Sequence, residues 1–199
     1  KIVEKTTALF NFQIQHLLAH SLGSLIATYY LANCAHRVQK AVLSSPCFGL
    51  PLKHPLRDEL IIALMNLFGQ GERYVFGKGA YKPAHLEHNE LSFCKTRMKW
   101  MNRVNRKHAE LHLGGPTFRW VHLCLNAVKR LPNIIPRVEI PVLILQSEKE
   151  KIVDNKKLGE LAARFPNARC ETVQNAKHEI LFERDEIRAK VMDKLRAFY

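Results

Sequence analysis

The sequence has no long hydrophobic run and no closely spaced pair of cysteines, and each absence excludes a class of protein. Its longest apolar stretches, such as Leu60–Met65, fall far short of the roughly 18 residues that a membrane-spanning helix needs. The five cysteines are odd in number and widely spaced, which argues against a disulfide framework and against a cysteine zinc site. We therefore expect a globular protein of a reducing compartment.

Acidic residues are scarce in this chain. It carries 31 Lys and Arg against 18 Asp and Glu, a formal net charge of +13 with histidine neutral, and such a balance favours anionic partners. Between Leu91 and Ala109 there is no acid, while six basic residues are interleaved with apolar ones such as Trp100. This stretch is either a solvated helix face or a basic amphipathic surface that rests on anionic lipid. Because no recognised nucleic-acid motif accompanies the charge, we expect no nucleic-acid partner.

Short apolar stretches alternate with helical patterns along the chain. Residues 14–19 have the pattern of a buried strand that ends at His20-Ser21, a helical pattern covers 22–33, and 41–43 is a second apolar strand. The alternation returns near the end, with a strand over 141–145, a helix over 155–165, a short strand near 170–173 and a last helix over 185–198. This order is typical of an α/β fold with a mostly parallel sheet and flanking helices.

The stretch 51–115 interrupts this alternation. Helically spaced apolar residues open it, a loop punctuated by glycines follows, and the basic stretch comes next. A new helix begins at Gly114-Gly115-Pro116-Thr117 and runs to about Arg130. We interpret 51–115 as a largely helical cap insertion that divides the core into 1–50 and 116–199.

A serine stands where the first strand pattern meets the first helix pattern, in Ala19-His20-Ser21-Leu22-Gly23. A nucleophile elbow places its serine on such a sharp strand-to-helix turn, so that the hydroxyl is exposed above the sheet. Small residues two before and two after the serine let the backbone bend without collision, and Ala19 and Gly23 fill these places. The motif alone is a weak signal, but a strand before it and a helix after it are the context that it needs.

Candidates for the acid and the base of a Ser–acid–His triad follow later strands, in the order that an elbow of this kind uses. The charged loop after 141–145 offers Glu150 and Asp154, with Glu148 as a weaker third; a solvated surface loop is the other explanation of such a run. His178 lies between the last short strand and the last helix, which sets it apart from the other histidines. The joint order of serine, acid and histidine is much harder to obtain by chance than any one of them.

Five blocks of sequence carry a resemblance to a known family: Leu18-Ala19-His20-Ser21-Leu22-Gly23, Gly114-Gly115-Pro116-Thr117 with Trp120, Leu143-Ile144-Leu145-Gln146, Ile152-Val153-Asp154-Asn155, and His178-Glu179-Ile180-Leu181-Phe182-Glu183. On these blocks, the last two of which are the most specific, nearly the whole chain resembles the monoacylglycerol-lipase-like (serine aminopeptidase S33 type) α/β-hydrolases, and within them the bacterial lysophospholipases. The resemblance implies Ser21 as nucleophile and His178 as base. It implies Glu150 as the acid, where relatives carry an aspartate, with Asp154 as the rival.

The resemblance also implies an activity. A serine hydrolase of this kind would cleave the fatty-acyl ester of lysophospholipids to fatty acid and glycerophosphodiester, without a metal or cofactor. A monoacylglycerol lipase or an acyltransferase on the same fold is one alternative, and a non-catalytic lipid-binding fragment is another. The expected partners are a monoacyl lipid and an anionic membrane surface, with the protein cytoplasmic and peripheral on the inner membrane.

One departure from the family concerns the strands that relatives carry before the elbow, which are absent here. We therefore expect the chain to be part of a longer protein. The backbone N–H of Leu22 supplies one oxyanion donor, while the second would come from the absent strands, and losing one donor costs about a hundredfold or more in rate. The cap insertion would form the acyl pocket from Leu60, Ile61, Leu64 and Phe68, although ordinary core packing explains each of them at least as well.

Overall fold

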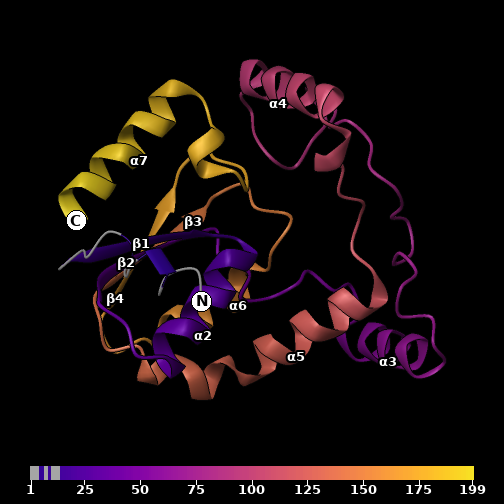
Figure 1. Cartoon of the computed structure of the whole chain (residues 1–199), viewed down its shortest axis with the longest axis horizontal. Helices are drawn as coiled ribbons and strands as arrows, with labels where there is room; N and C mark the ends of the chain where they lie inside the picture. Colours follow the sequence, from indigo (N-terminus) through magenta and orange to yellow (C-terminus); the bar gives the residue numbers. More distant parts are fainter. Residues whose placement is uncertain (1–4, 7–8, 10–13) are drawn as a thin grey trace.

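The computed structural model describes residues 5–6, 9 and 14–199, and at its centre is a four-stranded sheet (Figure 1). The strands lie side by side in sequence order and span β1 Gln15–His20, β2 Val38–Ser44, β3 Val142–Ser147 and β4 Ala168–Val173. All three pairings are parallel, so each connection must cross from one end of the sheet to the other. The carboxyl ends of all four strands therefore meet at one edge of the sheet.

The two central strands are apolar on both faces because helices cover both. In β2, Leu43 packs into one hydrophobic core and its neighbour Val42 into the other. In β3, Ile144 and Leu145 divide between the same two cores. Nearly continuous apolar runs are typical of parallel strands buried in this way, which is why the sequence pattern of both strands was clear.

In the described part of the chain, three helices pack on one face of the sheet and one helix packs on the other. The first face carries α2 (Leu22–Asn33), α5 (Phe118–Ile134) and α6 (Asn155–Ala162). The opposite face is covered by α7 (Asp185–Phe198), whose buried stripe is Ile187, Val191 and Leu195. Figure 1 shows the sheet between α7 above and α2 below. This layered arrangement confirms the predicted α/β fold with a parallel sheet and flanking helices.

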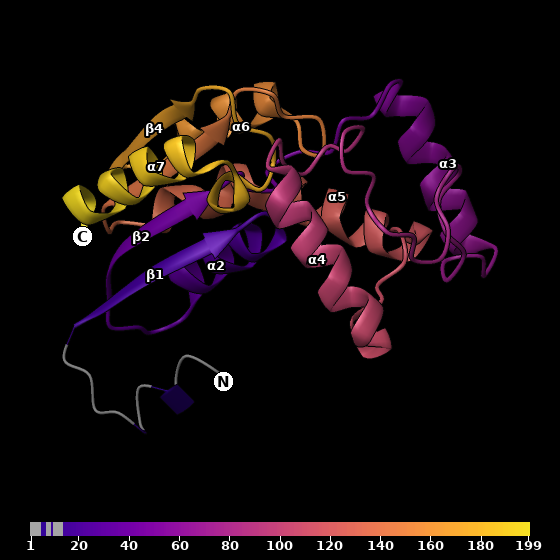
Figure 2. The same cartoon turned by 90° about the horizontal axis from the view of Figure 1, so that it is seen from above.

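Two further helices, α3 (Pro55–Leu67) and α4 (Lys95–Lys107), come between β2 and β3 in the sequence and stand beside the sheet (Figure 2). α3 packs on α5 through a third apolar cluster that includes Ile62 and Phe118. α4 is held differently: Met98 is fully buried, and the Asn102 side chain exchanges two hydrogen bonds with the backbone of Ala84. Within the described ranges, no helix has both the length and the apolar character that crossing a membrane requires.

Element boundaries differ from the sequence prediction mainly at helix and strand ends. β2 begins three residues earlier than expected, at Val38, which is itself buried. α5 continues past Arg130 to Ile134 with Pro132 inside it, because the fully buried Leu131 packs its last turn into the core. α6 ends at Ala162, short of the predicted Phe165.

The proposed division of the chain into 1–50, 51–115 and 116–199 stays a prediction. Part of its first segment lies outside the described residues.

Candidate active site

Ser21 stands in the turn between β1 and α2 in a backbone conformation that residues with a Cβ rarely adopt. Its φ of 49° and ψ of −121° lie in a region that favours glycine. Strain of this kind costs about 1–3 kcal/mol and persists only where the surroundings hold it. Here Ser21 N donates to Ser44 O at 2.9 Å, and Cys47 N donates to Ser21 O at 3.1 Å. This strained strand-to-helix turn has the geometry of a nucleophile elbow.

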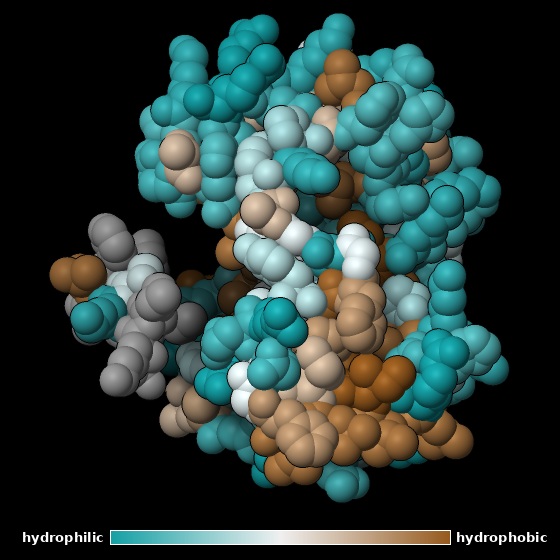
Figure 3. Space-filling view, turned by 90° about the vertical axis from the view of Figure 1, so that its right-hand side faces the viewer, coloured by the Kyte–Doolittle hydropathy of each residue, from teal (hydrophilic) through white to brown (hydrophobic). Residues whose placement is uncertain are grey.

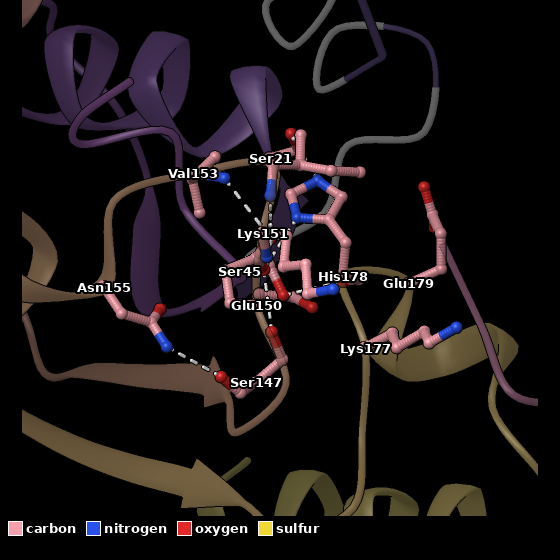
Figure 4. Close-up of polar contacts among 12 residues, drawn as sticks. Ser21, Ser45, Ser147, Glu150, Lys151, Val153, Asn155, Lys177, His178 and Glu179 are labelled. Atoms are coloured by element: carbon pink, nitrogen blue, oxygen red, sulfur yellow. Dashed lines mark hydrogen bonds and ion pairs between the residues drawn. The ribbon is translucent and has the colours of Figure 1, made fainter. Parts of the chain in front are cut away.

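His178 joins Ser21 to Glu150 (Figure 4). Its Nε2 lies 2.9 Å from Ser21 Oγ, and its Nδ1 lies 2.8 Å from Glu150 Oε2. The side chains of His178 and Glu150 are 4% and 0% exposed. A His178 ring protonated on Nδ1 donates to the carboxylate and leaves the Nε2 lone pair to accept the serine hydroxyl. The structure thus brings together the serine, the acid and the histidine that sequence order singled out.

Several donors hold Glu150 in its ionised form. Ser147 Oγ donates to Oε2 at 2.7 Å, and Oε1 accepts hydrogen bonds from Ile152 N at 2.8 Å and Lys151 N at 3.0 Å. Burial alone would raise the pKa of this carboxyl. The hydrogen bonds from His178, Ser147 and the loop backbone outweigh burial and lower the pKa to about 2. The carboxylate is therefore negative at neutral pH and can stabilise a positive charge on the imidazole.

The two other candidate acids lie away from the histidine. Asp154 Oδ1 accepts hydrogen bonds of 2.9 and 3.0 Å from backbone N–H groups in the first turn of α6, so this side chain is the N-cap of that helix. Glu148 Oε2 accepts a 2.7 Å hydrogen bond from Asn175 N. Among the three candidates, Glu150 is the acid that hydrogen-bonds His178.

Leu22 follows the serine directly and opens α2. As the first residue of the helix, its backbone N–H is among those without an intrahelical acceptor, and the positive end of the helix dipole lies there. Both features favour an oxyanion that develops beside Ser21. A Cβ built on Gly23 would meet no atom within 4 Å in the described part of the chain outside its neighbours and its own helix backbone, so the steric need for a small residue there stays a prediction.

A buried carboxylate that sequence reasoning missed fixes the loop that carries the histidine. Glu183 is fully buried, and its Oε1 accepts 3.0 Å hydrogen bonds from Lys177 N and from Phe93 N. Nearby, Glu179 N donates to Leu91 O at 2.9 Å. The segment before α4 is therefore bonded to the histidine loop at two places. The position of Glu183 after three apolar residues was the available signal.

A second pair of side chains lies beside the serine–histidine contact. His20 and Glu179 are the sequence neighbours of Ser21 and His178, and His20 Nε2 lies 3.3 Å from Glu179 Oε1. The rings of His20 and His178 meet edge to face with their centroids 5.0 Å apart. Burial would raise the pKa of Glu179, but the interaction with His20 outweighs burial and lowers the pKa. Within the described residues, His20, His178 and Glu179 form the group whose ligand atoms are close enough to hold a metal ion.

The four apolar residues predicted to bind an acyl chain all lie on α3 or at its end. Ile61 packs against α5, whereas Leu60, Leu64 and Phe68 are 60%, 41% and 72% exposed. Figure 3 shows apolar side chains gathered over the lower part of the molecule, where α3 and α5 lie. Leu60 lines an open groove of about 240 Å³ between these helices, and the structure does not enclose the four residues in one pocket. Their role in substrate binding stays a prediction.

A larger open groove of about 470 Å³ runs between α2 and α5. Its walls are mostly apolar and include Leu22, Leu25, Ile26, Trp120 and Leu123. Because Leu22 is also the residue after the serine, this groove begins next to the elbow. Sequence reasoning did not find it, since its walls come from helices a hundred residues apart.

The basic stretch forms the exposed face of α4, which lies at the hydrophilic top of Figure 3. Lys95 and Arg97 are neutralised by ion pairs with Glu87 and Asp185. The other four cations have no acidic partner in the described part of the chain, and all are exposed: Lys99, Arg103, Arg106 and Lys107. Trp100, 56% exposed, lies among them.

Comparison with known protein families supports the same fold. A family model described as alpha/beta hydrolase fold matches residues 1–185. The chain is 71% identical over 198 residues to a probable lysophospholipase L2 of Haemophilus influenzae. It is 28% identical over 196 residues to lysophospholipase L2 of Escherichia coli K12. The matches cover 100% and 93% of this chain but 63% and 57% of the two relatives, so the chain spans about three-fifths of their length.

Solved structures share the architecture at much lower sequence identity. A soluble variant of monoglyceride lipase from Saccharomyces cerevisiae, solved with a substrate analogue, has a TM-score of 0.74 at 19% identity, covering 98% of this chain and 65% of that one. A monoacylglycerol lipase from Paleococcus ferrophilus has a TM-score of 0.70 at 16% identity, covering 100% and 74%. At these identities the likeness establishes the fold alone.

Proposed function

The chain belongs to the alpha/beta hydrolase fold family, and we propose that the protein is a serine hydrolase that cleaves the fatty-acyl ester of lysophospholipids. The observation that carries the proposal is the continuous set of hydrogen bonds from Ser21 through His178 to Glu150. The lysophospholipid class is supported by the 71% identity to a probable lysophospholipase L2.

In the proposed reaction, His178 Nε2 takes the proton of Ser21 Oγ while that oxygen attacks the ester carbonyl. The Leu22 N–H stabilises the resulting oxyanion. The intermediate collapses to an acyl-serine, and His178 returns the proton to the departing glycerophosphodiester. Water then gives a proton to His178 and attacks the acyl group, which releases the fatty acid and restores Ser21. Glu150 keeps the imidazole oriented and stabilises its charged form, and no metal takes part.

A second candidate is a monoacylglycerol lipase or an acyltransferase, since two monoacylglycerol lipase structures share the fold of this chain. The proposed triad serves all three reactions, so substrate trials must separate them. Lysophospholipid and monoacylglycerol of one chain length would be offered separately, with and without a competing acyl acceptor. Faster release of fatty acid from lysophospholipid supports the first proposal, and an acylated acceptor as main product contradicts it.

The test of the triad is labelling with a fluorophosphonate probe, which reacts with activated serines. The chain and a version extended to the length of its relatives would each be compared with their Ser21→Ala variants. Labelling that requires Ser21, and that is faster in the extended version, is expected, because the second oxyanion donor is proposed to lie outside this chain. The proposed nucleophile would be ruled out if the extended protein does not label. It would also be ruled out if the Ser21→Ala variant of the extended protein labels at the same rate.

We also propose that the exposed face of α4 holds the protein on an anionic membrane, at the cytoplasmic side of the inner membrane. The four unpaired cations of this face complement the negative charge of such a membrane. The exposed Trp100 supplies an amphipathic ring for the membrane–water interface. Each such cation contributes about 1 kcal/mol near an anionic surface. All five cysteines are free thiols, which fits a reducing compartment.

Sedimentation with vesicles of pure phosphatidylcholine or of a mixture with anionic lipid tests this surface. Binding to the anionic vesicles, weakened by salt, is expected. Lys99→Glu with Arg103→Glu should abolish it. Arg188→Glu with Lys190→Glu, the same change of net charge on exposed positions of α7, is the matched control and should retain most of the binding. Equal losses in the two double variants would mean that net charge, and not α4, holds the protein on lipid.

A further inference from the structure

Three acceptor atoms converge beside the nucleophile elbow. They belong to His20, His178 and Glu179, and one ligand atom of each residue lies within 4.8 Å of those of the other two. His20 Nε2 and Glu179 Oε1 are already 3.3 Å apart. His20 Nε2 is almost inaccessible to solvent and makes no hydrogen bond within the described residues. Where His20 Nε2 carries a lone pair, it faces the Glu179 carboxylate as a second acceptor, and a cation between the two satisfies both.

The second nitrogen of each ring decides which lone pairs are available. His178 Nδ1 lies 2.8 Å from Glu150 Oε2, and a proton on Nδ1 donated to that oxygen leaves the lone pair on Nε2. His20 Nδ1 lies 3.3 Å from Ser44 Oγ, and a proton donated along this contact likewise leaves a lone pair on Nε2. In these tautomers both rings carry the Nε2 lone pair, and each has an oxygen beside Nδ1 that fixes its orientation. Zinc-bound histidines have this same support from behind.

We propose that His20, His178 and Glu179 form a binding site for a divalent transition-metal ion such as Zn²⁺, and that the ion inhibits the enzyme reversibly. Two imidazoles and one carboxylate are a common zinc ligand set, with bonds of about 2.0–2.2 Å. Tetrahedral bonds of that length separate ligand atoms by about 3.3–3.6 Å. The His20–Glu179 pair meets that separation as it stands, and His178 needs a movement of little more than 1 Å. A water molecule would complete the coordination.

The inhibitory part of this inference rests on the proposed function. A metal bound at His178 Nε2 occupies the lone pair that would accept the proton of Ser21, so the serine loses its base. Occupancy of the site and hydrolysis therefore exclude each other. A chelator that removes the ion returns the lone pair, and activity returns with it.

Binding is measured first, without any assay of activity. The untagged, metal-free chain is titrated with Zn²⁺ in competition with a chromophoric chelator, and one ion per chain is expected. His20→Gln and Glu179→Gln should each weaken binding at least tenfold, because each removes one ligand. His122→Gln, a histidine of α5 outside the group, is the matched control and should change binding less than twofold. Circular dichroism checks that the variants are folded.

No binding to the unaltered chain overturns the proposal, and so does binding that both ligand variants retain. Inhibition is then measured on the version extended to the length of its relatives, as the rate of fluorophosphonate labelling with Zn²⁺ divided by the rate with chelator. A drop of at least tenfold in the unaltered protein, and of less than threefold in His20→Gln, is expected. An extended protein that binds one ion but never labels would contradict the proposed function and leave the metal site standing. One that labels at the same rate with and without bound Zn²⁺ would overturn the inhibition.

Discussion

Glu150 Oε2 lies 2.8 Å from His178 Nδ1, while its other oxygen is held by backbone N–H groups of its own loop. Contacts within its own loop thus hold the carboxylate independently of the ring. In this position it orients the imidazole and favours the tautomer protonated on Nδ1. Asp154, four residues later, caps α6 instead. This division of roles between two nearby acids leads to opposite predictions for them.

Glu150→Gln should lower the rate of hydrolysis, or of fluorophosphonate labelling, by about 10³–10⁴-fold, because an amide can hold the wrong tautomer of the histidine. Asp154→Asn should leave the rate within about threefold. Asp154→Ala should cost about 1 kcal/mol of stability, the usual value of a lost helix cap. Labelling rates and urea unfolding measure both. A larger rate loss in Asp154→Asn than in Glu150→Gln would mean that Asp154, and not Glu150, is the acid of the triad.

The lowered pKa of Glu150 makes part of the stability dependent on pH. The pKa falls from 4.5 to about 2 on folding, so the contribution is complete above pH 4.5 and is lost as the pH falls towards 2. A shift of this size amounts to about 3 kcal/mol. Urea unfolding between pH 6 and pH 2.5 should therefore show a steeper loss for the unaltered chain than for Glu150→Gln. Parallel pH profiles of the two proteins would contradict the assigned shift.

The strained backbone of Ser21 predicts that glycine at this position gives a more stable protein than alanine. Ser21→Ala and Ser21→Gly both lose the hydroxyl, but only glycine adopts φ 49° without strain. After the greater freedom of glycine in the unfolded chain is subtracted, Ser21→Gly should be more stable than Ser21→Ala by about 1 kcal/mol. Thermal or urea unfolding of the two variants measures the difference. If Ser21→Ala proves the more stable, the turn stores no strain.

Buried Glu183 should matter for both stability and rate. Glu183→Ala leaves the backbone N–H groups of Lys177 and Phe93 without their acceptor, at about 1–3 kcal/mol each. Glu186→Ala, an exposed acid in the first turn of α7, should cost less than about 1 kcal/mol. Because Glu183 positions the histidine loop, labelling below the unfolding temperature should also slow in Glu183→Ala. Unfolding midpoints and labelling rates at 15 °C separate these two effects, and equal behaviour of the two variants would refute the positioning role.

Much of the fold could be predicted from the sequence because local patterns determine it. The apolar runs of β2 and β3 and the helical stripe of α7 identify elements that pack on a common sheet. The order of Ser21, Glu150 and His178 along these elements then places all three at the carboxyl end of the sheet. Because the carboxyl ends of parallel strands lie at one edge of the sheet, the approximate position of the site follows from chain order alone.

The remaining features depend on contacts between distant segments, which no local pattern encodes. The helical spacing on α3 was clear, but periodicity cannot tell whether a partner covers Leu60 and Leu64, and both turned out to be exposed. The crossing contact of His20 with Glu179 requires two loops to meet, and it was not expected. Chain order placed Asp154 and Glu150 in one loop, and only the family resemblance favoured Glu150, because the choice depends on which side chain turns towards the ring.

The sequence separation of 157 positions between Ser21 and His178 has a consequence for folding kinetics. Every strand of the parallel sheet must be in register before the two side chains can meet, and pairings of such long range form late and slowly. During refolding, helical circular dichroism should therefore recover well before the serine becomes reactive. On warming, a local opening of the loop that carries Ser21 or of the loop that carries His178 would separate the serine from its base while the sheet is still intact. The reactivity of the serine would therefore disappear below the temperature at which the protein unfolds.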